Sequence, residues 1–164
     1  EACNAIHSAG AVYLENPPHA HILTSTFLSN TASESGGAIV YECSYNNCQV
    51  EIDNNSTNNP SVFRKNHAEH AGGALYWTHF QPQVSENVIF DANSASYGKD
   101  IASIAHKIVL TDTTTSAIHH RLVSGGKVEE GFKFAVVDAY GQIVSTDDKT
   151  SISLEAITDG LKVS

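Results

Sequence analysis

The chain has few charged residues, and few of those are basic. Only 16% of its 164 residues are charged, and 9 Lys and Arg stand against 18 Asp and Glu, for a formal net charge of −9. Nucleic acids and anionic membranes bind basic surfaces, so this composition argues against both as partners. No run of about 18 apolar residues occurs, and no membrane-spanning helix is therefore expected.

Helical periodicity and metal-site motifs are also missing. Apolar residues do not recur at intervals of three and four, the spacing of an amphipathic helix. The three cysteines lack the paired spacing of a zinc site, and no cofactor is expected. Short β-branched and aromatic runs are present instead, bounded by Gly, Asn and Ser, which predicts an all-β protein.

A motif of Phe, Asn and Ala recurs in register along the first two thirds of the chain. Asn4 is assigned to the Asn position of a partial first copy, which gives Asn-to-Asn steps of 26, 36 and 27 residues. A period of this size is typical of stacked structural repeats. The three full copies are Phe27-Asn30-Ala32, Phe63-Asn66-Ala68 and Phe90-Asn93-Ala95.

Aligning the copies predicts short strands and two buried columns. Runs such as G-A-I-V-Y and G-A-L-Y-W follow the glycines, and I-L-T-S-T-F, S-V-F and N-V-I-F precede the Asn positions. Stacking equivalent positions would place like side chains above one another. The columns are Phe27, Phe63 and Phe90, and Val12, Ile39, Leu75 and Ile101.

Asn and Gly have physical roles in such a stack. An Asn amide can satisfy backbone groups at a turn and can bond to a stacked Asn, and Asn tolerates left-handed φ. Glycine supplies the φ freedom and the missing side chain that a tight corner needs. The predicted turn residues are Asn4, Asn30, Asn66 and Asn93, with the pairs Gly36-Gly37 and Gly72-Gly73.

These paired signatures, F-x-x-N and G-G-A-[ILV], resemble the repeats of chlamydial polymorphic membrane proteins. Similar repeats occur in surface proteins of algae and protists. Two copies match both halves, whereas the third has G-K-D-I and the first has Glu1 in place of Phe. The resemblance covers about residues 1–105 and implies a right-handed parallel β-helix in extracellular or cell-surface proteins, often adhesins.

The predicted fold therefore has two parts. A short right-handed parallel β-helix of about 3.5 coils spans residues 1–106, and a partial immunoglobulin-like β-sandwich spans 107–164. V-D-A-Y-G-Q-I-V within the second part resembles a segment of filamin- or invasin-type domains. Four or five strands are expected there, fewer than the usual seven or so. The resulting open sheet edge would recruit a partner strand.

The long middle repeat carries an insert that points to secretion. Cys43 and Cys48 are predicted to form a local disulfide in an oxidising compartment, with two free thiols as the alternative. Cys3 is left over and is a candidate for an intermolecular bond. Asn54 and Asn55 each begin an N-glycosylation sequon in a hydrophilic loop.

Catalytic and metal-binding residues do not form a recognisable set. The carboxylates before residue 105 are scattered and are not expected to stack at equivalent positions, as glycoside hydrolysis would require of a pair. His19 with His21, and His67 with His70, could chelate a metal, but solvent-facing histidines on turns are the simpler interpretation. Tyr41, Tyr76 and Trp77 could form a sugar-binding surface or pack in the core.

The composition, the repeats and the resemblance predict an extracellular structural or adhesive protein rather than an enzyme. It would self-associate, as a head-to-tail filament or by strand donation between subunits. The alternatives are a carbohydrate-binding surface module with glycan partners, or a fragment of a larger cell-surface adhesin.

Overall fold

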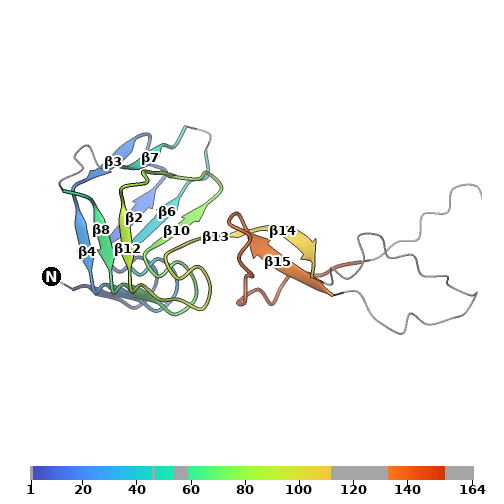
Figure 1. Ribbon diagram of the computed structural model, residues 1–164. Coiled ribbons are helices and arrows are strands. Elements are labelled where there is room, and N and C mark those ends of the chain that lie inside the picture. Colours follow the sequence, from blue (N-terminus) through green and yellow to red (C-terminus); the bar gives the residue numbers. More distant parts are fainter. Residues whose placement is uncertain (1, 46, 54–58, 112–132, 154–164) are drawn as a thin grey trace, which may run out of the picture.

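In the computed structural model, the described residues are 2–45, 47–53, 59–111 and 133–153. They contain fifteen strands and no helix (Figure 1). Four parallel sheets lie side by side, and an antiparallel pair follows them. Sheet A contains β1 (Asn4–Ala5), β5 (Thr31–Ala32) and β9 (His67–Ala68); sheet B contains β2 (Val12–Glu15), β6 (Ile39–Glu42), β10 (Leu75–Thr78) and β13 (Ile101–Ser103); sheet C contains β3 (Ala20–Leu23), β7 (Val50–Asp53) and β11 (Gln83–Val84); sheet D contains β4 (Thr26–Leu28), β8 (Val62–Arg64) and β12 (Ile89–Asp91).

The chain winds through these sheets in successive coils. Each of the three complete coils contributes one strand to each sheet, as a parallel β-helix requires, and the partial fourth coil adds β13 to sheet B. The first coil comprises residues 3–29, the second 30–65, the third 66–92, and a partial fourth 93–103. Equivalent residues of successive coils are 27, 36 and 27 positions apart. The described residues thus confirm an all-β stack of parallel coils.

The nine additional residues of the second coil fall in two places. The connection between β6 and β7 spans residues 43–49, whereas its first-coil counterpart spans 16–19. The remainder lies between β7 and β8, in residues 54–61. The segment of the middle repeat assigned to the insert therefore contains β7, which pairs with β3 and β11 inside the stack.

One predicted strand is in fact two. The run I-L-T-S-T-F divides between β3 and β4, because Thr24 adopts a left-handed φ of 43° and turns the chain. Ser25 stabilises this corner by donating its hydroxyl to the Leu23 carbonyl oxygen at 2.7 Å. A Thr-Ser corner has no Gly, Pro or Asn, the stronger turn residues, so the run resembles one continuous strand in the sequence.

Strand pairing becomes antiparallel after the fourth coil. β14 (Ala105–Leu110) pairs with β15 (Phe134–Asp138), and both extend away from the coils in Figure 1. β14 crosses the expected domain boundary at residues 106 and 107. Of the strands expected after Lys107, the Q-I-V-S-T run contains a single bridge, Val137 to Ile143. A sandwich is not seen in the described part of this segment.

Candidate functional site

A ladder of asparagines runs through the buried centre of the stack. Asn30 donates both its backbone N–H and its Nδ2 to Asn66 Oδ1, at 3.0 and 2.9 Å, and Asn66 does the same to Asn93 Oδ1. All three are buried. A buried amide that is fully hydrogen-bonded is stabilising, whereas an unpaired one costs free energy. Each Asn therefore joins its coil to the next.

The ladder has a different residue at each end. Asn93 donates its Nδ2 to Asp100 Oδ1 at 3.0 Å, so a carboxylate takes the place of a further Asn. At the other end, Cys3 donates its backbone N–H to Asn30 Oδ1 at 3.1 Å. Cys3 thus occupies the Asn position, and the assignment of Asn4 is wrong by one residue, since Asn4 pairs with Thr31.

The residue before each Asn makes the turn. Ser29, Lys65 and Ala92 have φ values of 56°, 55° and 53°. The Asn residues themselves are absent from the left-handed positions, so their contribution is the amide rather than tolerance of positive φ.

The two glycines of each pair have different roles at the other corner of the coil. Gly36 and Gly72 have φ values of 67° and 61°, a region that favours glycine. Gly37 and Gly73 are needed for close approach, because a Cβ there would collide with the carbonyl oxygen of the equivalent residue in the next coil.

Two apolar columns pack beside the ladder. The rings of Phe27, Phe63 and Phe90 stack with centroids 4.7 and 5.2 Å apart. The strand register also brings Val12, Ile39, Leu75 and Ile101 together in sheet B. Burial is complete only in the middle: Phe63 is 0% exposed, whereas Phe27 and Phe90 are partly exposed. Both ends of the core thus reach solvent.

The first coil forms the more open end. Its strands β1, β2, β3 and β4 are each the terminal strand of their sheet. Its inward residues Val12, Leu14, Ile22 and Phe27 are only partly buried, although their second-coil equivalents are almost fully buried. Leu28 on β4 is 48% exposed. This end offers unpaired backbone groups around an apolar centre, which is the chemistry of strand addition.

The fourth coil is partly covered by the turn that follows β15. Asp138, which is 0% exposed, accepts hydrogen bonds from the backbone N–H of Ser103 and from Gln142 Nε2, at 3.2 and 3.0 Å. Gln142 Nε2 also donates to the Ile101 carbonyl oxygen at 2.9 Å. These side chains bond to the β13 edge where a further strand would otherwise pair. We call residues 138–142 the cap.

An aromatic pair joins the cap to the core. Trp77 Nε1 donates to the Tyr140 hydroxyl at 3.0 Å, and the two rings meet edge to face with centroids 6.2 Å apart. A cleft of about 450 Å³ opens beside Tyr140; its lining residues are Lys99, Asp100, Ile101, Tyr140 and Gln142.

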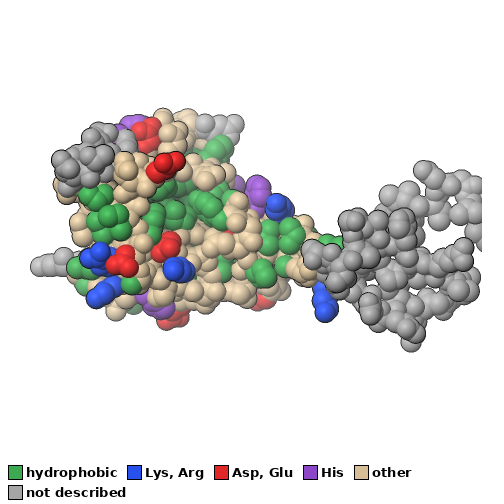
Figure 2. Space-filling view, in the orientation of Figure 1, with side chains coloured by type: hydrophobic (Ala, Val, Ile, Leu, Met, Phe, Trp, Pro, Cys, Tyr) green, Lys and Arg blue, Asp and Glu red, His purple; other side chains and the backbone are tan. Residues whose placement is uncertain are grey.

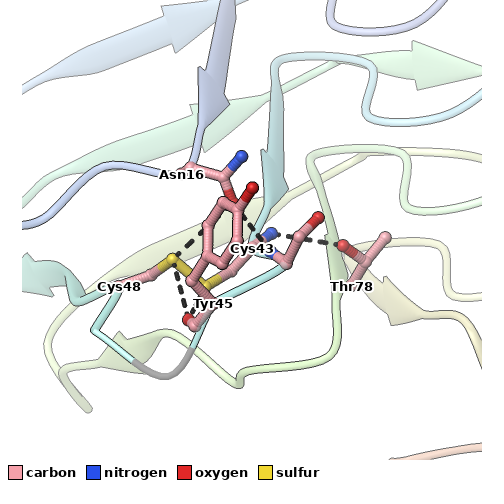
Figure 3. The surroundings of a disulfide bond; sticks show 6 residues. Asn16, Cys43, Tyr45, Cys48 and Thr78 are labelled. Atoms are coloured by element: carbon pink, nitrogen blue, oxygen red, sulfur yellow. Dashed lines mark hydrogen bonds between the residues drawn. A yellow bond between two sulfur atoms is a disulfide. The ribbon is translucent and has the colours of Figure 1, made fainter.

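The disulfide is confirmed in the loop that begins the second-coil insert. Cys43 and Cys48 are bonded, with Cα atoms 6.0 Å apart. Asn16 of the first coil lies beside the loop, and its Oδ1 accepts a hydrogen bond from Ser44 N at 2.7 Å (Figure 3). The bond therefore holds this loop against a neighbouring coil. Cys3 is exposed and free, and the sequons at Asn54 and Asn55 lie outside the described residues.

The proposed sugar-binding aromatics are mainly core residues. Tyr41 and Trp77 are 1% and 5% exposed and point inward from sheet B. Tyr76 points to the other side and packs partly against Ala71, Tyr97 and Ala102. These three residues therefore do not form an exposed platform.

One pair of carboxylates occupies equivalent positions in neighbouring coils, so the expectation that none would stack is wrong at this position. Glu15 and Glu42 are register partners in sheet B and do stack. Tyr13 lies beside them, and a hydrogen bond with Glu42, reinforced by partial burial and by the charges of both carboxylates, raises the pKa of Tyr13 to about 12. The phenol therefore remains a donor to Glu42 across the physiological range.

Of the candidate histidine pairs, the rings of His19 and His21 lie edge to face, with centroids 6.0 Å apart. His21 Nε2 lies 3.5 Å from Glu51, and His67 Nδ1 lies 2.9 Å from Ser94 Oγ. Among the residues that the structure describes, no three His, Cys, Asp or Glu side chains gather closely enough to hold a metal ion.

The sequence patterns do not identify Asp138, Gln142 and Asp100 as residues whose side chains hydrogen-bond to the coils of the stack. The D-x-Y-G segment is recognisable in the sequence, but its contacts are not, because those with Ser103 and Ile101 span 35 and 41 residues. The G-K-D-I copy contains a signal, because Asp100 stands where the three other copies have Ala and is followed by the same aliphatic position.

Comparison with known families gives one match. The model of the Chlamydia polymorphic membrane protein repeat matches residues 24–42. That segment includes both halves of one copy of the signature, F-x-x-N at residues 27–30 and G-G-A-I at residues 36–39. Comparisons with curated proteins and with solved structures found no match. The described residues contain no helix that is long and apolar enough to span a membrane. The chain is thus similar, over one copy of its motif, to a polymorphic membrane protein repeat.

Proposed function

We propose that the chain is a non-catalytic structural protein of an extracellular or cell-surface setting, and that it self-associates through its coil stack. The observation that carries this proposal is the first coil, where four strand edges surround a partly exposed apolar core. Such an edge is a template for pairing with another chain. The disulfide supports an oxidising compartment. The repeat similarity supports a surface location.

Sedimentation velocity of the 1–164 chain, with electron microscopy of the same sample, tests self-association. The proposal expects species larger than the 17.5 kDa monomer, increasing with concentration. A chain that sediments only as a folded monomer at every concentration would contradict it. A reducing agent in the buffer separates non-covalent association from a bond through Cys3.

A carbohydrate-binding role is the second candidate, and the cleft beside Tyr140 favours it. Tyr140 is 40% exposed, and Lys99, Asp100 and Gln142 also line the cleft. An exposed aromatic face flanked by polar groups suits a sugar ring. A glycan array would show binding that Tyr140→Ala removes; an array without binding would dismiss this candidate.

For residues 107–164, the D-x-Y-G resemblance and the antiparallel pairing of β14 with β15 support an immunoglobulin-like module. An experimental structure tests this assignment. Further strands beside β14 or β15 would support it, and a lone two-stranded ribbon would contradict it.

A further inference from the structure

We infer that the first coil binds the first coil of a second copy, so that self-association closes as a two-fold dimer. The inference rests on the proposed self-association and specifies which surface is used. Three features of the stack carry it: the charge of the first coil, the residue that begins the ladder, and the cap.

The first coil has almost no charge. Residues 2–30 contain a single carboxylate, Glu15, and no Lys or Arg, in a chain whose net charge is −9. A two-fold contact places each patch against its own copy, so like charges would meet. Exposed strand edges are normally protected by charged residues, especially Lys. The near-neutral first coil lacks that protection and suits contact with itself.

The opposite end differs in this respect. Residues 83–103 contain Glu86, Asp91, Lys99 and Asp100. Asp91 also forms an ion pair with Arg64 across sheet D at 2.7 Å. Figure 2 shows acidic and basic side chains next to one another in the lower part of the face of the stack turned to the viewer, with hydrophobic side chains gathered above them.

The ladder disfavours an in-register parallel coil on top of the first. Each Asn uses the Oδ1 of the next Asn as its acceptor. Cys3 occupies that position in the first coil and has no side-chain carbonyl to act as the acceptor. An additional Asn stacked there would lose its buried partner, which costs free energy. A two-fold contact between first coils runs antiparallel and does not require the ladder.

The cap disfavours a head-to-tail filament. Such a filament would pair the β2 edge of one copy with the β13 edge of another. Asp138 and Gln142 already bond to Ser103 and Ile101 on that edge. On sheet B, only the β2 edge then remains open, and a contact that uses one surface twice is closed.

Leu28→Lys and Ile89→Lys form a matched pair for the test. Both side chains are exposed, 48% and 41%, and both lie on sheet D, on the terminal strands β4 and β12 at opposite ends. Sedimentation velocity under reducing conditions should show a wild-type monomer–dimer equilibrium. Leu28→Lys should raise the dimer Kd by about tenfold or more, because two Lys meet, whereas Ile89→Lys should leave it within about twofold.

The outcomes separate the two proposals. Dimers that Ile89→Lys weakens as strongly as Leu28→Lys, or an open series of larger species, would overturn the first-coil contact and leave self-association standing. A wild-type chain that is purely monomeric would overturn both. Circular dichroism verifies that each variant is folded, and Leu23→Lys on β3 replaces Leu28→Lys if that variant does not fold.

Discussion

At the scale of single residues, the central feature of the stack is the hydrogen bonding of the Asn66 side-chain amide and not the volume that this side chain fills. Asn66 receives hydrogen bonds from Asn30 and gives them to Asn93 and to the Phe27 carbonyl oxygen. The amide of Asn66, in the third coil, therefore bonds to residues of the first, second and fourth coils. Asn4 follows the ladder residue Cys3 by one position. It is exposed, and its register partner is Thr31 and not Asn30.

Asn66→Ala should lower the free energy of unfolding by about 2–4 kcal/mol, because it leaves buried donors without an acceptor. Asn4→Ala should change it by no more than about 0.5 kcal/mol, as for an ordinary surface site. Urea denaturation measures both. Equal losses for the two variants would contradict the register in which Cys3, and not Asn4, occupies the ladder.

A second residue-scale prediction concerns Tyr13. The hydrogen bond with Glu42 stabilises the protonated phenol of Tyr13 and raises the pKa of Tyr13 from 10.0 to about 12. The raised pKa means that the contribution of this group to stability is complete below pH 10 and is lost as the pH rises towards 12. Alkaline absorbance titration of the wild type, compared with Tyr13→Phe, should show one phenol titrating near 12. In Glu42→Gln that step should move towards 10; an unchanged step would exclude Glu42 as the cause.

At the scale of elements, position in the stack decides how much each repeated residue contributes. Phe63 is enclosed by Phe27 and Phe90, whereas each of these has a stacking neighbour on one side only. Phe63→Ala should therefore cost about 3–5 kcal/mol, the range for a fully buried Phe. Phe27→Ala should cost clearly less. Thermal and chemical unfolding give the ranking, and a larger loss for Phe27 would show that the first coil is covered in the monomer.

The cap is the element that sequence patterns alone could not define. Asp138→Ala should weaken the attachment of residues 138–142 by about 2–4 kcal/mol, since hydrogen bonds to a buried carboxylate are lost. Trp77 is the only tryptophan in the sequence and bonds to Tyr140 in the cap. In Asp138→Ala, the Trp77 fluorescence should therefore change under milder denaturing conditions than those that unfold the whole stack. Asp148→Ala, at an exposed carboxylate in the same segment, is the control and should leave the emission unchanged.

The repeats explain which parts of the fold could be predicted. Phe27, Phe63 and Phe90 stack as the spacing indicates because equivalent positions of a solenoid superpose. The first copy was misplaced because its ladder residue is Cys3, and the nearest Asn lies one position later. The corner at Thr24 is hard to predict because it contains no Gly, Pro or Asn, and the contacts of Asp138 are hard to predict because its partners are distant in sequence.

At the scale of the whole molecule, the two ends of the stack are chemically different. The first coil is almost free of charge and open on four sheets. The fourth coil meets a carboxylate and an amide side chain that occupy part of its edge. This asymmetry gives the stack a direction, and it is the basis for placing self-association at the first coil.

Hydrogen–deuterium exchange of the 1–164 chain at low and high protein concentration tests this account most directly. In a parallel ladder, alternate amides of a terminal strand point away from the sheet, so they exchange freely unless another chain covers them. Peptides covering β2 to β4 (residues 12–28) should gain protection as concentration rises, whereas peptides covering β11 and β12 (residues 83–91) should not. Protection that appears only at residues 83–91, or no concentration dependence at either end, would contradict assembly through the first coil.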